Sequence, residues 1–326
     1  MDKSSEFDSF AIYASCNSGE DISLSIDVNV WINRKQGCDF DLGINIPPTS
    51  EPGIMTIYVP YQLSRSQIAD LSYLLHDRYI YRAIFNENKV IGDELIGPGS
   101  PNYPKDSNFA ICSLSLSDLV LKRHAQGGSV LQFRFNDNDQ ISPKYYRFRF
   151  PIPPLDLSIA SAGDLREAIT GPIIPFRTFA FIEFNQLRGL PEDIGHALIC
   201  SQSKNAKVKL ALVVDTEWTV EAWRNPYKVR QLETQGWDNY QKKLLPSSHS
   251  WFQRRHRFTV YQWEEVNRSS VFEFCLSRKV ISIKTILFYL SVLVGVELIT
   301  NALVTCVQIL SPILIELASK CMQGVC

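Results

Sequence analysis

The segment from Thr285 to Ser319 constrains this chain more than any other part of its sequence. It contains no lysine or arginine and consists mostly of Leu, Ile, Val and Phe. About 20 such residues cross a bilayer as a helix, and each favours insertion by roughly 0.3–0.6 kcal/mol. Glu297, near the centre, opposes insertion by about 3 kcal/mol on the same scale. Two helices turning near Asn301 would each be too short to span, so we expect one transmembrane helix over residues 280–319.

Polar residues recur along this helix at spacings that keep them on one side. At about 100° per residue they fall within roughly 100° of one another, and they are Glu297, Asn301, Thr305, Gln308 and Glu316, with Ser319 at the end. We call these six residues the polar stripe. Such groups rarely face lipid, so we expect the chain to form a homo-oligomer. The stripe would then line a pore, or only hold the oligomer or a partner together. The remaining alternative is a helix that covers the soluble part and never spans.

Charge around the hydrophobic segment predicts its orientation. Lys320 stands alone after it, whereas several basic residues precede it: Arg254, Arg255, Arg257, Arg278, Lys279 and Lys284. Positive residues remain on the cytosolic side, and residues 1–20 lack the basic and apolar regions of a secretory signal. We therefore expect a C-terminal membrane anchor with residues 1–278 in the cytosol. The six basic residues are candidate contacts for lipid headgroups.

The run Trp251–Arg257 leaves two other interpretations open, because it mixes aromatic rings with cations. Stacking on a nucleic acid is one. The other is a solvated strand edge beside buried aromatic residues. The whole chain has a net charge of −1 and a pI of about 6.5, which argues against nucleic-acid binding.

The first half of the chain shows the period-two alternation of strands. Residues 24–32 and 38–46 alternate on either side of a short turn, which predicts a hairpin. A second hairpin is expected to join 131–135 to 146–150. Pro151–Pro154 suggests a boundary between a sandwich-like subdomain, 1–154, and a mixed α+β subdomain, 155–278. The predicted class is a β-rich α+β soluble part followed by a transmembrane helix.

Helices are expected at a few places in the soluble part. Apolar spacing predicts one over residues 64–76, another begins after Ser161, and Pro191 suits the first position of a helix over 191–201. A tryptophan-rich stretch, 219–245, also has a helical pattern. Strands are expected at 179–184, 208–214, 258–263 and 271–275.

No motif in the sequence predicts a reaction. There is no phosphate-binding loop, no nucleophile elbow and no metal-ligand spacing among the five histidines. The eight cysteines form no Cys-x-x-Cys pair, which is typical of reduced thiols. We therefore assign no catalytic, cofactor-binding or metal-binding residue. An enzyme without recognisable motifs is the third and least favoured class of function.

The combination of a soluble domain and a membrane helix indicates a function at a membrane. Bacterial anti-phage effectors commonly share this architecture, so we expect a membrane-tethered effector or sensor that oligomerises and perturbs or permeabilises the membrane. Its soluble part would respond to a ligand or protein partner that the sequence does not name. The alternative is a tail-anchored scaffold, cellular or viral, that recruits partners to a membrane surface. Both rest on architecture alone.

Overall fold

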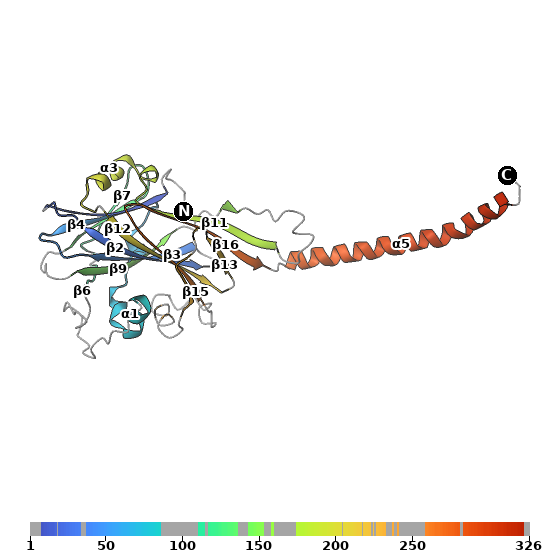
Figure 1. The fold of residues 1–326 in the computed structure, drawn as a ribbon, viewed down its shortest axis with the longest axis horizontal. Helices are drawn as coiled ribbons and strands as arrows, with labels where there is room; N and C mark the ends of the chain where they lie inside the picture. Colours follow the sequence, from blue (N-terminus) through green and yellow to red (C-terminus); the bar gives the residue numbers. More distant parts are fainter. Residues whose placement is uncertain are drawn as a thin grey trace. The chain divides into compact units, whose positions relative to one another are not determined.

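The computed structural model describes the chain from residue 8 to residue 322 with gaps (Figure 1). The residues outside the description are 1–7, 18, 34–36, 86–109, 115–116, 136–142, 153–157, 160–173, 204, 217, 223, 225, 233–236, 238–239, 241–257, 281–282 and 323–326. Residues 1–160 and 177–277 form one compact unit, and residues 161–176 and 278–326 form a second.

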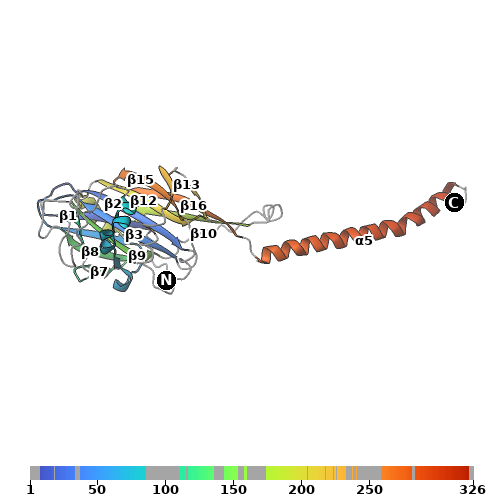
Figure 2. The same ribbon diagram turned by 90° about the horizontal axis from the view of Figure 1, so that it is seen from below.

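Strands dominate the first unit, as the sequence predicts, and they build two sheets (Figure 2). The first sheet runs in the order β13 (Trp218–Ala222), β16 (Ser270–Val280), β11 (Ile174–Phe184), β1 (Ser9–Cys16), β4 (Gly53–Val59), β8 (Ser129–Phe135), β7 (Val120–Arg123), and β10 (Ser158–Ile159) pairs with β11. The second runs β14 (Lys228–Gln231), β15 (Phe258–Asn267), β12 (Asn205–Asp215), β2 (Ser23–Asn33), β3 (Gly37–Ile46), β9 (Lys144–Ile152), β5 (Ala69–Asp70), and β6 (Ala110–Ile111) pairs with β9.

The main core lies between the inner faces of these sheets. Alternation places every second side chain of a strand on one face. Val28 and Phe40 of the second sheet therefore enter the same cluster as Ile12 and Ile57 of the first. Burying such side chains contributes about 1.5–3 kcal/mol each, which explains why the alternating segments form a sandwich.

Strands from both halves of the chain interleave in both sheets. β1 pairs with β11 in parallel, and β2 pairs with β12 in parallel. Residues on the two sides of segment 151–154 thus share one core, and residues 1–160 and 177–277 form a single compact unit. Pro151 lies within β9 and is paired with Asp39 of β3, so this proline does not mark a domain boundary.

Several predicted elements are confirmed, and others are corrected. The hairpin of β2 and β3 is present, and helix α3 (Glu192–Cys200) follows Pro191. The second predicted hairpin is wrong, because β8 pairs with β4 and β7 whereas β9 pairs with β3 in the other sheet. The helix predicted after Ser161 lies outside the described residues.

Two predicted helices are replaced by shorter elements. Residues 64–76 form the 3₁₀ turns η1 (Arg65–Gln67) and η2 (Ser72–His76) around β5, and the helix α1 (Arg78–Phe85) comes after them. A third such turn, η3 (Leu187–Gly189), precedes α3. Described residues within 219–245 include β13 and β14, so that part is not one helix.

The outer face of each sheet is partly covered. Leu190, Ile194 and Leu198 of the α3 region pack on β1 and β4 of the first sheet. On the second sheet, η2 and α1 pack around Trp31 and Tyr145, together with Trp237 and Tyr240 from the segment after β14. This second covered face carries the most charged part of the interior.

Helix α5 (Ile283–Met322) belongs to the second unit and runs for 40 residues. It is continuous through Asn301 and contains Pro312. Residues 290–319 are long and apolar enough to cross a membrane, with a mean hydropathy of 2.0 and none of the segment buried. The prediction of one helix rather than a helical pair is confirmed.

Candidate functional site

The covered face of the second sheet is arranged in cross-strand rows. In one row, Gln262, Ala211, Asn29, Asp41 and Arg149 stand side by side on β15, β12, β2, β3 and β9. A parallel row, two residues along each strand, places Lys209 next to Asp27, then Gly43 and Arg147. Long-range strand pairing therefore brings carboxylates and guanidinium groups together beneath the covering segments.

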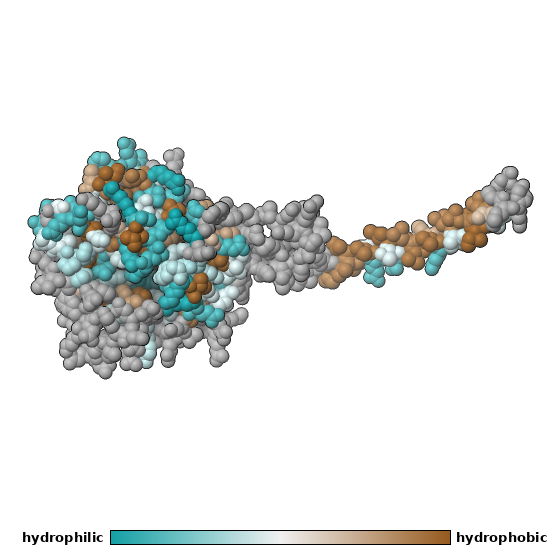
Figure 3. Space-filling model, in the orientation of Figure 1, coloured by the Kyte–Doolittle hydropathy of each residue, from teal (hydrophilic) through white to brown (hydrophobic). Residues whose placement is uncertain are grey.

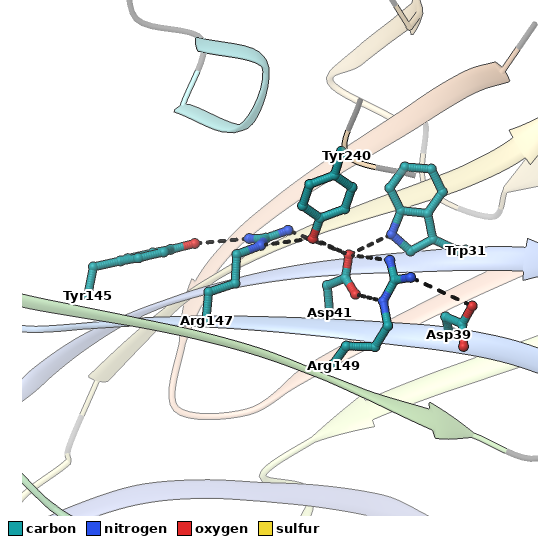
Figure 4. A network of polar contacts seen from close by, with 7 residues as sticks. All are labelled: Trp31, Asp39, Asp41, Tyr145, Arg147, Arg149 and Tyr240. Carbon is teal, nitrogen blue, oxygen red and sulfur yellow. Dashed lines mark hydrogen bonds and ion pairs between the residues drawn. The ribbon is translucent and has the colours of Figure 1, made fainter. Parts of the chain in front are cut away.

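Asp41 is the centre of a fully buried hydrogen-bond network (Figure 4). Its carboxylate accepts hydrogen bonds from Trp31 Nε1 at 2.7 Å and from the Tyr240 hydroxyl at 2.7 Å. The guanidinium of Arg149 donates twice to the same carboxylate, through Nε and through Nη2. This paired geometry is the strong form of a charge-assisted hydrogen bond.

Arg147 extends the network along β9. Its Nε donates to the Tyr240 hydroxyl at 3.2 Å and its Nη1 donates to the Tyr145 hydroxyl at 3.0 Å. Its Nη2 lies 3.8 Å from Asp41 Oδ2. Gly43, opposite Arg147, leaves the space that the Tyr145 hydroxyl fills, since a Cβ there would lie 2.0 Å from that oxygen.

Each ionisable group of the network has one stable protonation state. Burial alone would raise the pKa of Asp41, but Arg149, Arg147 and the Tyr240 hydrogen bond outweigh it and hold that pKa below its usual value. Burial raises the pKa of Tyr240 and of Tyr145, so both hydroxyls remain protonated. An ionised carboxylate saturated by donors is not poised to accept a proton. The cluster is therefore suited to holding Tyr240 against the sheet.

A hollow adjoins the network on the same face. Ala211 forms its floor with a single methyl group, and Asn29 and Gln262 flank that residue in the row. The apolar walls come from five residues: Ile84, Val213, Leu232, Trp237 and Val260. Arg230 of β14, opposite Val260, completes the lining. The cavity volume is about 20 Å³, which is room for about one water molecule.

The polar stripe of α5 is exposed along its described length. Glu297, Asn301, Gln308 and Glu316 are all exposed, and Thr305 donates its hydroxyl to the Asn301 carbonyl of its own helix at 2.8 Å. Figure 3 shows hydrophilic atoms gathered along one side of this helix. The opposite side consists of large aliphatic side chains: Val292, Val296, Ile299, Leu303, Val307, Leu310, Leu314 and Leu317.

The predicted lipid-contacting residues are placed only in part. Arg278 and Lys279 lie near the end of β16, and Lys284 lies in the first turn of α5. The upstream residues Arg254, Arg255 and Arg257 lie outside the described residues. Among the residues that the structure describes, no three His, Cys, Asp or Glu side chains gather closely enough to hold a metal ion.

The buried network was not predicted from the sequence. Its signal is present as charges at every second position, Asp39 and Asp41 in one predicted strand and Arg147 and Arg149 in another. Nothing local shows that these strands are neighbours. Tyr240 carries no such signal, because its partner Asp41 is 199 residues away.

Comparison with known proteins gives no family. No family model and no curated protein matches the chain. A similar solved structure is the M1 zinc metallopeptidase from Deinococcus radiodurans, with 10% identity, a TM-score of 0.30, and coverage of 78% of this chain and 42% of that chain.

Proposed function

We propose that this chain is a membrane-tethered effector whose α5 helices cross the bilayer and assemble through the polar stripe. The observation that carries the proposal is a continuous apolar helix with exposed Glu297 and Asn301 on one side and large aliphatic residues on the other. Carboxylate and amide groups in a membrane almost always face other helices or water. Further copies of α5 would supply such surroundings. When their stripes meet at a common axis, the polar groups face other helices or enclosed water, and the aliphatic sides face lipid.

The sandwich is the sensing part in this proposal. The basic residues before α5 favour a cytosolic location for it, and its response to a ligand or protein partner would control the assembly. Assembled stripes would perturb or permeabilise the membrane. Bacterial anti-phage defence is one setting for such an effector.

A matched pair of cysteine variants tests the assembly. Asn301→Cys lies on the stripe, and Leu303→Cys lies about 200° away around the helix and only about 3 Å along it. In a chain with Cys200, Cys306, Cys321 and Cys326 replaced by serine, oxidation in the membrane should link Asn301→Cys into dimers and leave Leu303→Cys monomeric. Equal linkage of both variants, or of neither, would contradict the proposed packing.

The second candidate function is a tail-anchored scaffold. It is favoured by the size of the sandwich, which is a far larger surface for partners than an anchor requires. In that case the stripe only holds helices together, and Glu297→Gln should change little because an amide still bonds across helices. Permeabilisation that depends on the Glu297 charge separates the effector from the scaffold.

A further inference from the structure

Helix α3 carries a histidine and a cysteine together on its exposed face. Ile194 and Leu198 of this helix pack against the first sheet, so the opposite face is turned to solvent. His196 and Cys200 are both exposed on that face. Residues four positions apart are neighbours on a helix surface, and here the two side chains meet. Cys200 Sγ lies 3.8 Å from Nδ1 and 3.9 Å from Nε2 of His196.

That separation is close to the distance between two ligands of one metal ion. Zinc is bound by a thiolate at about 2.3 Å and by an imidazole nitrogen at about 2.0–2.1 Å. At a tetrahedral angle, those bond lengths place the sulfur and the nitrogen about 3.5 Å apart. A small rotation of the exposed His196 ring would bring one nitrogen and the sulfur onto a single ion. The pair can therefore act as two ligands without a change in the backbone of α3.

The end of α3 that carries Cys200 is held in place. Arg268 Nη2 donates to the Leu198 carbonyl at 3.3 Å and to the Ile199 carbonyl at 3.1 Å. The Ser201 hydroxyl donates to the Leu198 carbonyl at 2.7 Å. These bonds satisfy carbonyl groups that the end of a helix leaves without partners. The backbone beneath the pair is thus ordered before any ligand binds.

The chemistry of the pair selects the class of metal. Thiolate and imidazole are ligands for zinc and other borderline or soft ions, whereas calcium and magnesium prefer oxygen. Cys200 is also the accessible thiol of the sandwich. The other cysteines of that unit are buried or half-buried, and they are Cys16, Cys38, Cys112 and Cys275.

One chain supplies only half of a zinc site. Structural zinc sites have four ligands, and among the residues that the structure describes no third His, Cys, Asp or Glu lies near enough to complete this one. A two-fold axis through the metal would bring the same pair from a second copy. The charges suit this arrangement, because α3 begins with Glu192 and ends beside Arg268, so antiparallel helices turn opposite charges toward each other. Ile199, 51% exposed beside the pair, would be covered at the contact.

From this geometry we propose that His196 and Cys200 bind Zn²⁺ together with the same two residues of a second copy of the chain. The four ligands form a tetrahedral site of two cysteines and two histidines. Each Cys200 thiol releases its proton to solvent as its sulfur–zinc bond forms, because the thiolate is the ligand. The inference concerns the sandwich alone. It does not depend on membrane permeabilisation or on the packing of α5, and the two proposals fail separately.

The test uses Co²⁺, a spectroscopic substitute for Zn²⁺, with the full chain in a neutral detergent after a chelator has removed bound metal. Cys306, Cys321 and Cys326 are replaced by serine, so that thiols of the C-terminal segment do not contribute. Titration should produce the visible bands of tetrahedral cobalt and a thiolate charge-transfer band, both saturating at one Co²⁺ per two chains. Zn²⁺ should remove both bands, since a tetrahedral site of thiolates and imidazoles suits zinc.

Variants assign the bands to α3. Cys200→Ser should abolish the charge-transfer band. His196→Gln should weaken cobalt binding about tenfold or more, because even residues behind the ligands are worth about 10–100-fold in metal affinity. The matched controls are His76→Gln and Cys112→Ser, an exposed histidine and a half-buried cysteine elsewhere in the sandwich, which should titrate as the parent chain does. Absence of the tetrahedral bands would overturn the proposal, as would a charge-transfer band that Cys200→Ser retains or saturation at one Co²⁺ per chain.

Discussion

Replacing Asp41 with asparagine should destabilise the sandwich severely. The side chain of Asp41 is fully buried and accepts four hydrogen bonds, from Trp31, Tyr240 and twice from Arg149. An amide keeps one acceptor oxygen but turns its NH₂ group toward donors, and it leaves the Arg149 and Arg147 charges without the buried counter-ion. Breaking a buried ion pair from one side costs about 3–5 kcal/mol. We expect a loss of that size in the free energy of unfolding.

Asp39→Asn is the matched control. Asp39 lies on the same strand and faces the same Arg149, but at 3.9 Å and with 35% of its side chain exposed. Exposed pairs of this kind contribute about 0–1 kcal/mol. Urea unfolding of the full chain in detergent, followed by tryptophan fluorescence, measures both. If Asp41→Asn loses no more stability than Asp39→Asn, the network does not hold the covered face as described.

The pH dependence of Asp41→Asn gives an independent check. Because the folded pKa of Asp41 is lowered, the carboxylate contributes stability that is fully present above its unfolded pKa of about 3.9. That contribution is lost as pH falls through the folded pKa. The stability difference between wild type and variant should therefore be constant above about pH 5 and shrink below about pH 4. A difference that grows on acidification would refute the assignment of an ionised Asp41.

Two further predictions concern the sandwich and the anchor. Gly43→Ala should cost about 1–3 kcal/mol in the same urea assay, because its Cβ would lie 2.0 Å from the Tyr145 hydroxyl; with Tyr145→Phe in the same chain, the combined loss should be smaller than the sum of the two. Removal of residues 280–326 should release a soluble protein with an unchanged near-ultraviolet spectrum, whereas the full chain should stay with membranes in alkaline carbonate. Aggregation of the shortened chain, or extraction of the full one, would place α5 in the soluble fold.

Local patterns in the sequence predicted where strands lie better than they predicted which strands pair. The alternation of residues 24–32 and 38–46 specified a hairpin, because the two strands are adjacent in the chain and in the sheet. The same alternation in β8 and β9 suggested a hairpin that does not exist, since period two reports which face is buried and not which strand lies alongside. The spacing of apolar residues in 64–76 fits a helix, yet this segment forms two 3₁₀ turns, and η2 packs on the sheet.

The two candidate sites differ in how visible they are in the sequence. Residues of the polar stripe are three, four or eight positions apart, so the helical period alone places them on one side. The network and the hollow combine residues from strands that pair over long distances, such as Asp41 with Arg149 and Asn29 with Ala211. Only the assembled sheet brings those residues together, and no local pattern could have predicted the hollow.

Induced expression with a membrane-potential dye tests the central claim most directly. Cells that produce the full chain should depolarise, and cells that produce the chain shortened after Arg278 at the same level should keep their potential. Glu297→Gln, which retains shape but removes the charge of the stripe, should depolarise less than wild type. If the full chain leaves the potential where the shortened chain does, α5 anchors the sandwich without permeabilising the membrane, and the effector proposal is wrong.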